Sequence, residues 1–392
     1  MTSEEIKEIK KQLSIDNCAI DRICGCFVNN EKEKQFVSKE AFMSLSAEDE
    51  QHKYFEIFRK TLTGQIGKNQ IELEFPLAEE QDGGKAQFLL KLRDSHLEDD
   101  SLIDEFYDRI IQDYDTVEKF YIILIHAIYD VPGRTTDLIG MEDASDSVYD
   151  HIMCAICPVK LEKGSLSYDP KENRISEKIR DWIVADPSHG FVFPAFNDRC
   201  ADVHSMLYYT KKSEEMQEEF IDAMFGAMPP LSAKTQADFF NTVVEETLGE
   251  DISLQDVMAI NDNVRIMIRD HSQDDEPYLM DKKEIRKVFE KSGISSDTME
   301  DFDWKYDEVV KNTTDAEDKD KTSIQASNLT GIKKIDIRTP DVVIRVNPDR
   351  SDLIETRMID GRECIVIVAN DRVVINGMDV HTMSGSQLNA RD

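Results

Sequence analysis

Residues 120–133, with the sequence FYIILIHAIYDVPG, decide the fold class. This stretch is rich in β-branched and aromatic residues and ends on a Pro-Gly pair, which is typical of a buried strand that stops at a turn. The same character continues in YDHIMCAICPVKL (149–161), WIVADPSHGFVFPAF (182–196) and HSMLYYTKK (204–212). No long helical period separates these segments, so we predict antiparallel pairing and not a βαβ layout. For residues 145–158 a helix remains an alternative.

Toward the N-terminus, strands alternate with amphipathic helices. Apolar residues at helical spacing predict helices near 2–13, 47–62, 85–94 and 100–113, and two further segments, 18–28 and 70–75, have strand character. Thr2 or Ser3 followed by Glu5 predicts a capped start for the first helix. Residues 1–212 are therefore predicted to form an α+β domain with a mainly antiparallel sheet.

Beyond residue 212 the pattern changes twice. Residues 213–310 return to helical spacing and predict an acidic helical segment, with Gly249 and Gly293 as C-terminal caps. Residues 311–323 are almost entirely polar and predict a linker.

After the linker, residues 324–383 predict a small all-β module, and residues 384–392 a flexible tail. The turn pairs Asp360-Gly361 and Asn376-Gly377 favour the positive φ angles of two-residue hairpins. With 392 residues, of which 40% are hydrophobic, the chain is long enough for more than one core.

Charge limits the classes of partner. The chain carries 47 basic and 80 acidic residues, a net charge of −33, and residues 213–320 alone hold 11 basic and 29 acidic residues, a net −18. Such a field repels phosphate backbones and anionic lipid, so we expect neither direct nucleic-acid binding nor membrane binding. The acidic surface either serves solubility or attracts a basic protein partner, and imitation of nucleic acid is a third interpretation.

The expected compartment is the cytoplasm. The N-terminal segment MTSEEIKEIKKQL lacks an apolar signal core, and the longest apolar run, residues 120–125, is too short to cross a bilayer. Seven cysteines in a chain of this length indicate reduced thiols and no disulfide framework.

One cysteine pair has metal-ligand spacing. Cys154 and Cys157 form a CxxC motif, and His151 precedes it by three residues. Zinc sites use such pairs, but they need about four N or S ligands, and no second pair lies nearby. The motif is therefore either part of a metal site or a pair of buried structural thiols. His126, within the predicted core strand, is interpreted as a buried histidine whose hydrogen bonds are satisfied.

The densest polar cluster lies in HGFVFPAFNDRCADVH (189–204). Its candidate catalytic residues are Asp198, Asp202 and His204, and its candidate binding residues are His189, Asn197 and Arg199. Carboxylates beside a histidine can hold a divalent metal or perform general acid–base chemistry. Alternatively, the aspartates cap turns while Arg199 pairs with one of them. The chain has no phosphate-binding glycine loop, HExxH or GxSxG motif.

Several short segments carry a resemblance to a known family. ICGCFVNNEKEK, KYFEIFRKTLTG, GKNQIELEFPL, LLKLRDS, YDVPG, CAICPV, FPAFNDR, LYYTK, ETLGE and TPDVVIRVNP occur in this order between Ile23 and about Val380. In these segments the chain resembles a bacterial family of about 400 residues that is classified as a domain of unknown function. The resemblance implies a bacterial protein that is a single whole-chain unit, and it implies no activity, cofactor or catalytic residue.

These observations favour a binding or regulatory protein with a basic partner over an enzyme. The alternative is a metal-assisted hydrolase that uses the Asp/His cluster at 198–204, with a divalent metal as cofactor. An enzyme should show these side chains converging in a pocket, whereas a binding protein should show a continuous acidic or apolar surface patch.

Overall fold

The computed structural model describes residues 1–45, 48–134, 140–170, 173–177, 180–227, 229–249, 252–271, 277–313, 323–329, 335–369, 373–375 and 378–380. The chain divides into two compact units, Met1–Lys234 (unit 1) and Thr235–Asp392 (unit 2). No helix among the described residues is both long and apolar enough to cross a membrane.

Unit 1 is built on an antiparallel sheet. Its eight described strands run in the order β2-β1-β4-β5-β9-β12-β3, and β8 pairs with β5 beside this path. The strands are β1 (Ile20–Val28), β2 (Lys34–Ala41), β3 (Gln70–Glu74), β4 (Lys119–Arg134), β5 (Gly140–Leu161), β8 (Trp182–Val184), β9 (His189–Phe193) and β12 (Ser205–Thr210). The prediction of a mixed α+β fold with mainly antiparallel pairing is confirmed. Residues 145–158, for which a helix was an alternative, lie in strand β5.

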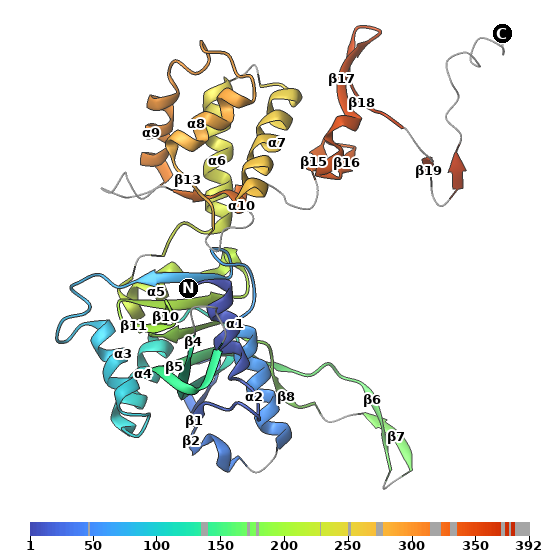
Figure 1. Ribbon diagram of the computed structural model, residues 1–392. Coiled ribbons are helices and arrows are strands. Elements are labelled where there is room, and N and C mark those ends of the chain that lie inside the picture. The colour runs from blue at the N-terminus through green and yellow to red at the C-terminus, as the bar shows by residue number, and fades with distance from the viewer. Residues whose placement is uncertain are drawn as a thin grey trace. The chain divides into compact units, whose positions relative to one another are not determined.

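Helices cover both faces of this sheet (Figure 1). The helices of unit 1 are α1 (Ser3–Lys11), α2 (Glu48–Thr61), α3 (Lys85–Asp94), α4 (Asp100–Asp113) and α5 (Glu218–Phe225). One core packs α3, α4 and α5 against the sheet, and the other packs α1 and α2 against the opposite face. The central strands β4 and β5 alternate between the two cores residue by residue, because successive side chains of a strand point to opposite faces.

Two small hairpins complete the described part of unit 1. They pair β6 (Leu166–Asp169) with β7 (Arg174–Glu177), and β10 (Ala195–Asn197) with β11 (Cys200–Asp202). Helix α1 begins at the predicted cap, where the Thr2 side chain accepts a hydrogen bond from the Glu5 backbone and the Glu5 side chain bonds the Thr2 backbone.

Unit 2 contains a helical core of its own. Its helices are α6 (Ala233–Leu248), α7 (Leu254–Asp270), α8 (Lys282–Lys291), α9 (Phe302–Thr313) and α10 (Ala326–Leu329), and its short strands β13 (Leu279–Met280) and β14 (Ile324–Gln325) pair. Ile324, Ala326 and Leu329 are buried in the same core as the helices. Gly249 and Gly293 both have the positive φ of a C-terminal cap, 66° and 82°.

Three antiparallel hairpins follow toward the C-terminus. They pair β15 (Ile335–Arg338) with β16 (Val343–Val346), β17 (Ile354–Ile359) with β18 (Arg362–Ile367), and β19 (Val373–Ile375) with β20 (Met378–Val380). Asp360 and Gly361 form the β17–β18 turn with φ angles of 49° and 74°, as predicted. Asn376-Gly377, most of the predicted linker and the tail lie outside the described residues. The predicted domain boundaries at 212, 310 and 323 stay predictions.

Candidate functional site

The predicted Asp/His cluster forms a small hairpin held by local contacts. Asp198 and Arg199 are the two central residues of the β10–β11 turn and have φ angles of 51° and 57°. Asp202 accepts hydrogen bonds from the backbone of His204 (3.0 Å), the Ser205 hydroxyl (2.6 Å) and the Asn197 amide (2.8 Å). These are the bonds of a turn and not of an open site.

The histidines and the arginine of this segment point to different partners. The His204 ring, 70% exposed, pairs through Nδ1 with Glu80 Oε1 at 2.8 Å and not with an aspartate of the segment. His189 is buried and bonds the Tyr114 hydroxyl at 2.7 Å. The Arg199 guanidinium donates to Glu8 and to the Pro132 carbonyl, both at 2.8 Å. The structure therefore gathers Asn197 and Asp202 but disperses the rings, and a catalytic role for the segment stays a prediction.

The CxxC residues lie on the buried strand β5. Cys154 belongs to the core under α3 and α4, and Cys157 belongs to the core on the opposite face. A spacing of three residues places two strand side chains on opposite faces, so the sheet separates the two sulfur atoms. The His151 ring is on the same face as Cys157 and stacks on Tyr149, with ring centroids 4.2 Å apart. The structure does not bring the predicted metal ligands together, and all seven thiols are free.

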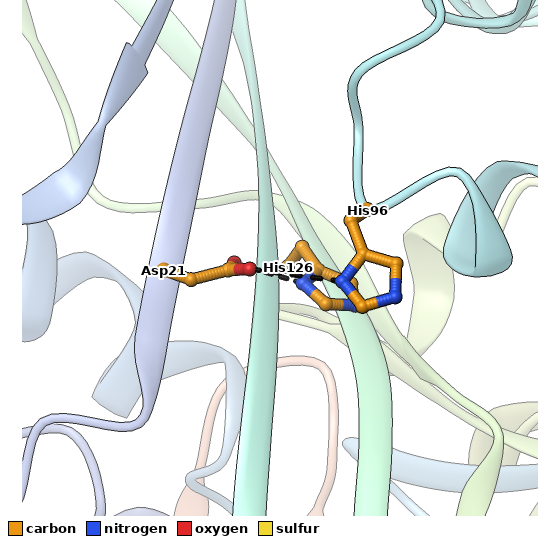
Figure 2. A group of neighbouring side chains, drawn as sticks. All are labelled: Asp21, His96 and His126. Carbon is orange, nitrogen blue, oxygen red and sulfur yellow. Dashed lines mark hydrogen bonds and ion pairs between the residues drawn. The ribbon is translucent and has the colours of Figure 1, made fainter.

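A different cluster of ionisable side chains surrounds His126. His126 lies on β4 and is fully buried, as predicted for a core histidine. Its Nδ1 bonds Asp21 Oδ1 of β1 at 2.8 Å, and its Nε2 bonds Asp150 Oδ1 of β5 at 2.7 Å. The His96 ring, from the α3–α4 connection, lies 4.4 Å from the His126 ring, and Figure 2 shows the Asp21 carboxylate directed at His126 with His96 beside it.

A β-bulge positions Asp21 for this contact. In the β1–β4 register, Ile20 faces Ala127 and Arg22 faces His126, so Asp21 is an extra residue between them. A bulge interrupts the alternation of side chains between the two faces of the sheet. It can therefore change the face toward which a single side chain points. In a regular strand Ile20 and Cys24, four residues apart, would lie on the same face of the sheet. Here Ile20 packs in the core with α1 and α2, and Cys24 packs in the core on the opposite face. Asp21 is thereby turned toward the face that carries His126.

Hydrogen bonds decide the charge of this cluster. Burial by itself would lower the pKa of His126, but its bonds to Asp150 and Asp21 raise the pKa to about 9. Burial likewise opposes ionisation of Asp150, yet its bond to His126 lowers the Asp150 pKa below the usual range. Both shifts favour a protonated His126 ring beside an ionised Asp150 carboxylate.

The local sequence around His126 does not reveal its partners. Asp21 and Asp150 are acidic residues inside largely apolar strand sequences, CAIDRICG and YDHIMCAI, and this was the available signal. The contacts of Asp21 and Asp150 with His126 depend on the strand order and on the β1 bulge, and no local sequence pattern reveals either.

Unit 2 carries a second feature, an exposed tryptophan on an acidic helix. Trp304 of α9 is 65% exposed. Two carboxylates, Glu300 and Asp301, lie four and three residues before Trp304, in the turn that leads into the helix. Two more, Asp307 and Glu308, lie three and four residues after it. The Asp301 carbonyl already accepts a helical hydrogen bond from the Lys305 backbone, and residues at these spacings neighbour one another on a helix surface. We call Trp304 and these four carboxylates the α9 acidic face, and its sequence signal was EDFDWKYDE.

Unit 2 also contains a cavity of about 520 Å³. Its walls include the stacked rings of His271 and Tyr278, 3.9 Å apart, and they carry both carboxylates and lysines. Tyr278 donates to Glu284 at 2.7 Å, so its hydroxyl is already engaged. None of the predicted catalytic or metal-binding residues lines this cavity.

Fold and surface together define a mixed α+β protein with a sheet-based unit and an acidic helical unit. The chain belongs to the family described as Domain of unknown function (DUF4317), which it matches over residues 1–378. A comparison with curated proteins found no match.

Proposed function

We propose that this protein binds a basic segment of a partner protein on the α9 acidic face. The observation that carries the proposal is Trp304, a large aromatic side chain exposed among four carboxylates. An exposed indole among carboxylates adds an apolar contact that solubility does not require.

The opposite side of α9 explains why this face points outward. Phe302, Tyr306, Val309 and Val310 are buried in the core of unit 2 and hold the helix in one orientation. Trp304 therefore cannot turn inward without removing four apolar side chains from that core. The buried side chains fix which face of α9 is exposed, and a face fixed in advance reduces the entropy lost when a partner binds.

Charge favours a cationic occupant. Asp307 already pairs with Lys282 at 2.8 Å. For Glu300, Asp301 and Glu308, no cation among the described residues lies within ion-pair distance. An indole face attracts ammonium and guanidinium groups, and tryptophan is enriched among the residues that dominate binding energy. The chain contains an internal example, because the Lys119 ammonium lies 3.8 Å above the Trp182 ring.

The test uses Trp304 as its own reporter. Trp182 and Trp304 are the two tryptophans of the chain, so Trp182→Phe leaves Trp304 as the sole indole. The probe is a synthetic peptide of about twelve residues rich in Arg and Lys, with a Glu-rich peptide of equal length as reference. We expect the basic peptide to change Trp304 emission, with an affinity that falls steeply between about 50 and 300 mM NaCl.

Matched charge variants distinguish binding at the α9 acidic face from attraction by the net negative charge of unit 2. Glu300→Gln/Glu308→Gln should weaken binding about three- to tenfold. Glu245→Gln/Glu246→Gln removes the same charge from exposed positions on α6 of the same unit and should have a smaller effect. Equal losses in both double variants, or unchanged Trp304 emission at saturation, would overturn the proposal.

A further inference from the structure

We propose that Asp21, His96 and His126 form a binding site for a divalent transition-metal ion of the Zn²⁺ type, and that Asp150 orients His126. This inference is independent of the proposed partner surface, because all four residues belong to unit 1. It rests on the arrangement of the donor atoms.

The donor atoms lie close enough to share one ion. One nitrogen from each histidine and one Asp21 oxygen all lie within 4.8 Å of one another. His96 Nδ1 lies 4.0 Å from Asp21 Oδ2, and His126 Nδ1 lies 2.8 Å from Asp21 Oδ1. Donors that hold an ion at about 2.0–2.2 Å in tetrahedral geometry lie about 3.4 Å apart, so binding requires the His96 ring to move toward Asp21. Two imidazoles and one carboxylate suit zinc and its neighbours, and they leave a coordination position for water or a ligand.

Asp150 acts on His126 from outside the coordination shell. Its Oδ1 lies 2.7 Å from His126 Nε2, on the side of the ring away from Asp21. In the metal-bound form this nitrogen keeps its hydrogen, and the ion takes the place of the proton on Nδ1, toward Asp21. A carboxylate behind a metal-binding histidine is a recurring arrangement, which fixes the tautomer and raises the basicity of the ligand.

The scaffold holds each ligand in place at a conformational cost. Asp21 occupies the β1 bulge, and His96 and Leu97 both have the left-handed backbone, with φ angles of 50° and 54°. Non-glycine residues keep that backbone conformation only where the surrounding structure holds them in it. The fully buried Leu97 side chain anchors the α3–α4 connection, so the His96 ring is held over His126.

The simpler alternative is a purely structural ion cluster, with His126 neutralising the two carboxylates. That interpretation accounts for Asp21, His126 and Asp150, and it gives His96 only a distant contact, since His96 Nδ1 lies 4.0 Å from Asp21 Oδ2 and His126 already has a partner on each nitrogen. A metal site uses all four side chains. It is also reachable from solvent, because Asp21 and His96 are exposed while His126 is buried.

Metal titration of the full chain distinguishes the metal site from the purely structural ion cluster. The protein is purified without a histidine tag, treated with a chelator, dialysed, and titrated with Zn²⁺ by calorimetry and with Co²⁺ by visible absorption. We expect one ion per chain at this site, and a Co²⁺ spectrum with the intensity of four- or five-coordination. His96→Gln and Asp21→Asn should each reduce the affinity at least about tenfold.

Asp21 and His96 are exposed, so their substitution leaves the core intact. Thermal melting in EDTA checks that both variants fold. His52→Gln is the matched control, since it removes an exposed histidine from α2 of the same unit, and it should leave the affinity unchanged. Unchanged binding in His96→Gln and Asp21→Asn, or no binding at about 100 µM Zn²⁺, would overturn the proposal and leave the structural ion cluster.

Discussion

At the scale of single residues, two buried histidines show how partners set charge. His126 on β4 and His151 on β5 occupy opposite faces of the sheet. His126 lies between two carboxylates, which raise its pKa to about 9. His151 stacks on Tyr149 and has no carboxylate in hydrogen-bond contact among the described residues, so burial lowers its pKa to about 4. Similar burial therefore produces an imidazolium in one case and a neutral ring in the other.

The pKa of His126 predicts a loss of stability on the alkaline side. Because the folded-state pKa of about 9 exceeds the unfolded value of about 6.5, the stabilisation is complete below pH ~6.5 and is lost as the pH rises through 9. Substitution His126→Gln should thus cost about 2 kcal/mol more at pH 6 than at pH 10, after allowance for the partly exposed carboxylates.

This difference is measured by urea unfolding in EDTA, with wild type and variant compared at each pH. Because wild type and variant share the cysteines and the other groups that titrate in this pH range, the contributions of these groups to the free energy of unfolding cancel in the comparison. Besides the two carboxylates, Arg93 and His96 bear on the charge of the cluster, because both favour the ionised form of Asp150 and so keep its pKa low. A pH-independent cost would show that His126 is neutral in the folded protein.

At the scale of elements, the close packing of neighbouring strands and helices depends on glycine at one position. Gly190 lies on β9 between β5 and β12. A Cβ atom there would lie 2.5 Å from the Cys154 carbonyl oxygen of β5 and 2.9 Å from Thr61 Cγ2 of α2. Helix α2 can therefore approach the sheet at this point only because no side chain intervenes.

Substitution Gly190→Ala should destabilise unit 1 by about 1–3 kcal/mol, because the backbone carbonyl cannot move aside without distorting the β5–β9 ladder. The control is Gly164→Ala, whose Cβ would meet only the flexible end of the Arg180 side chain, at 2.9 Å. It should change the free energy of unfolding by less than about 0.5 kcal/mol. Chemical denaturation followed by far-UV circular dichroism measures both, and equal effects would contradict the packing argument.

At the scale of the whole molecule, negative charge is in excess almost throughout. Residues 1–212 hold 26 basic and 41 acidic residues, a net −15, and residues 213–320 add −18, while residues 321–392 are neutral. Ion pairs such as Arg199–Glu8 and Lys282–Asp307 use part of the basic complement. The remaining carboxylates repel one another across the surface, and this repulsion opposes the compact state.

Salt should therefore stabilise the protein. Raising NaCl from about 10 to 300 mM shortens the screening length from roughly 30 Å to less than about 8 Å, so the repulsion between exposed carboxylates weakens. The thermal midpoint should rise by several degrees, as followed by scanning calorimetry at about pH 7.5. An uncharged osmolyte at matched osmolality controls for general solvent effects. A midpoint that falls with salt would mean that attractive ion pairs outweigh the repulsion.

Much of the secondary structure and fold class followed from local sequence. Apolar spacing predicted α3 and α4 with their observed bounds, turn chemistry predicted the Asp360-Gly361 hairpin, and the β-branched run at 120–133 predicted antiparallel strands. These features are local, because they depend on the side-chain period of 3.6 or 2 and on the φ angles that individual residues allow.

The candidate sites needed the tertiary structure. Asp21, His96, His126 and Asp150 are spread widely along the chain, and only the strand order β1-β4-β5 and the β1 bulge bring them together. Conversely, Asp198, Asp202 and His204 are neighbours in sequence, yet a tight hairpin holds Asp202 in local bonds and directs the imidazole to Glu80. Proximity along the chain is a poor guide to chemistry, because strand alternation and turns decide where each side chain points.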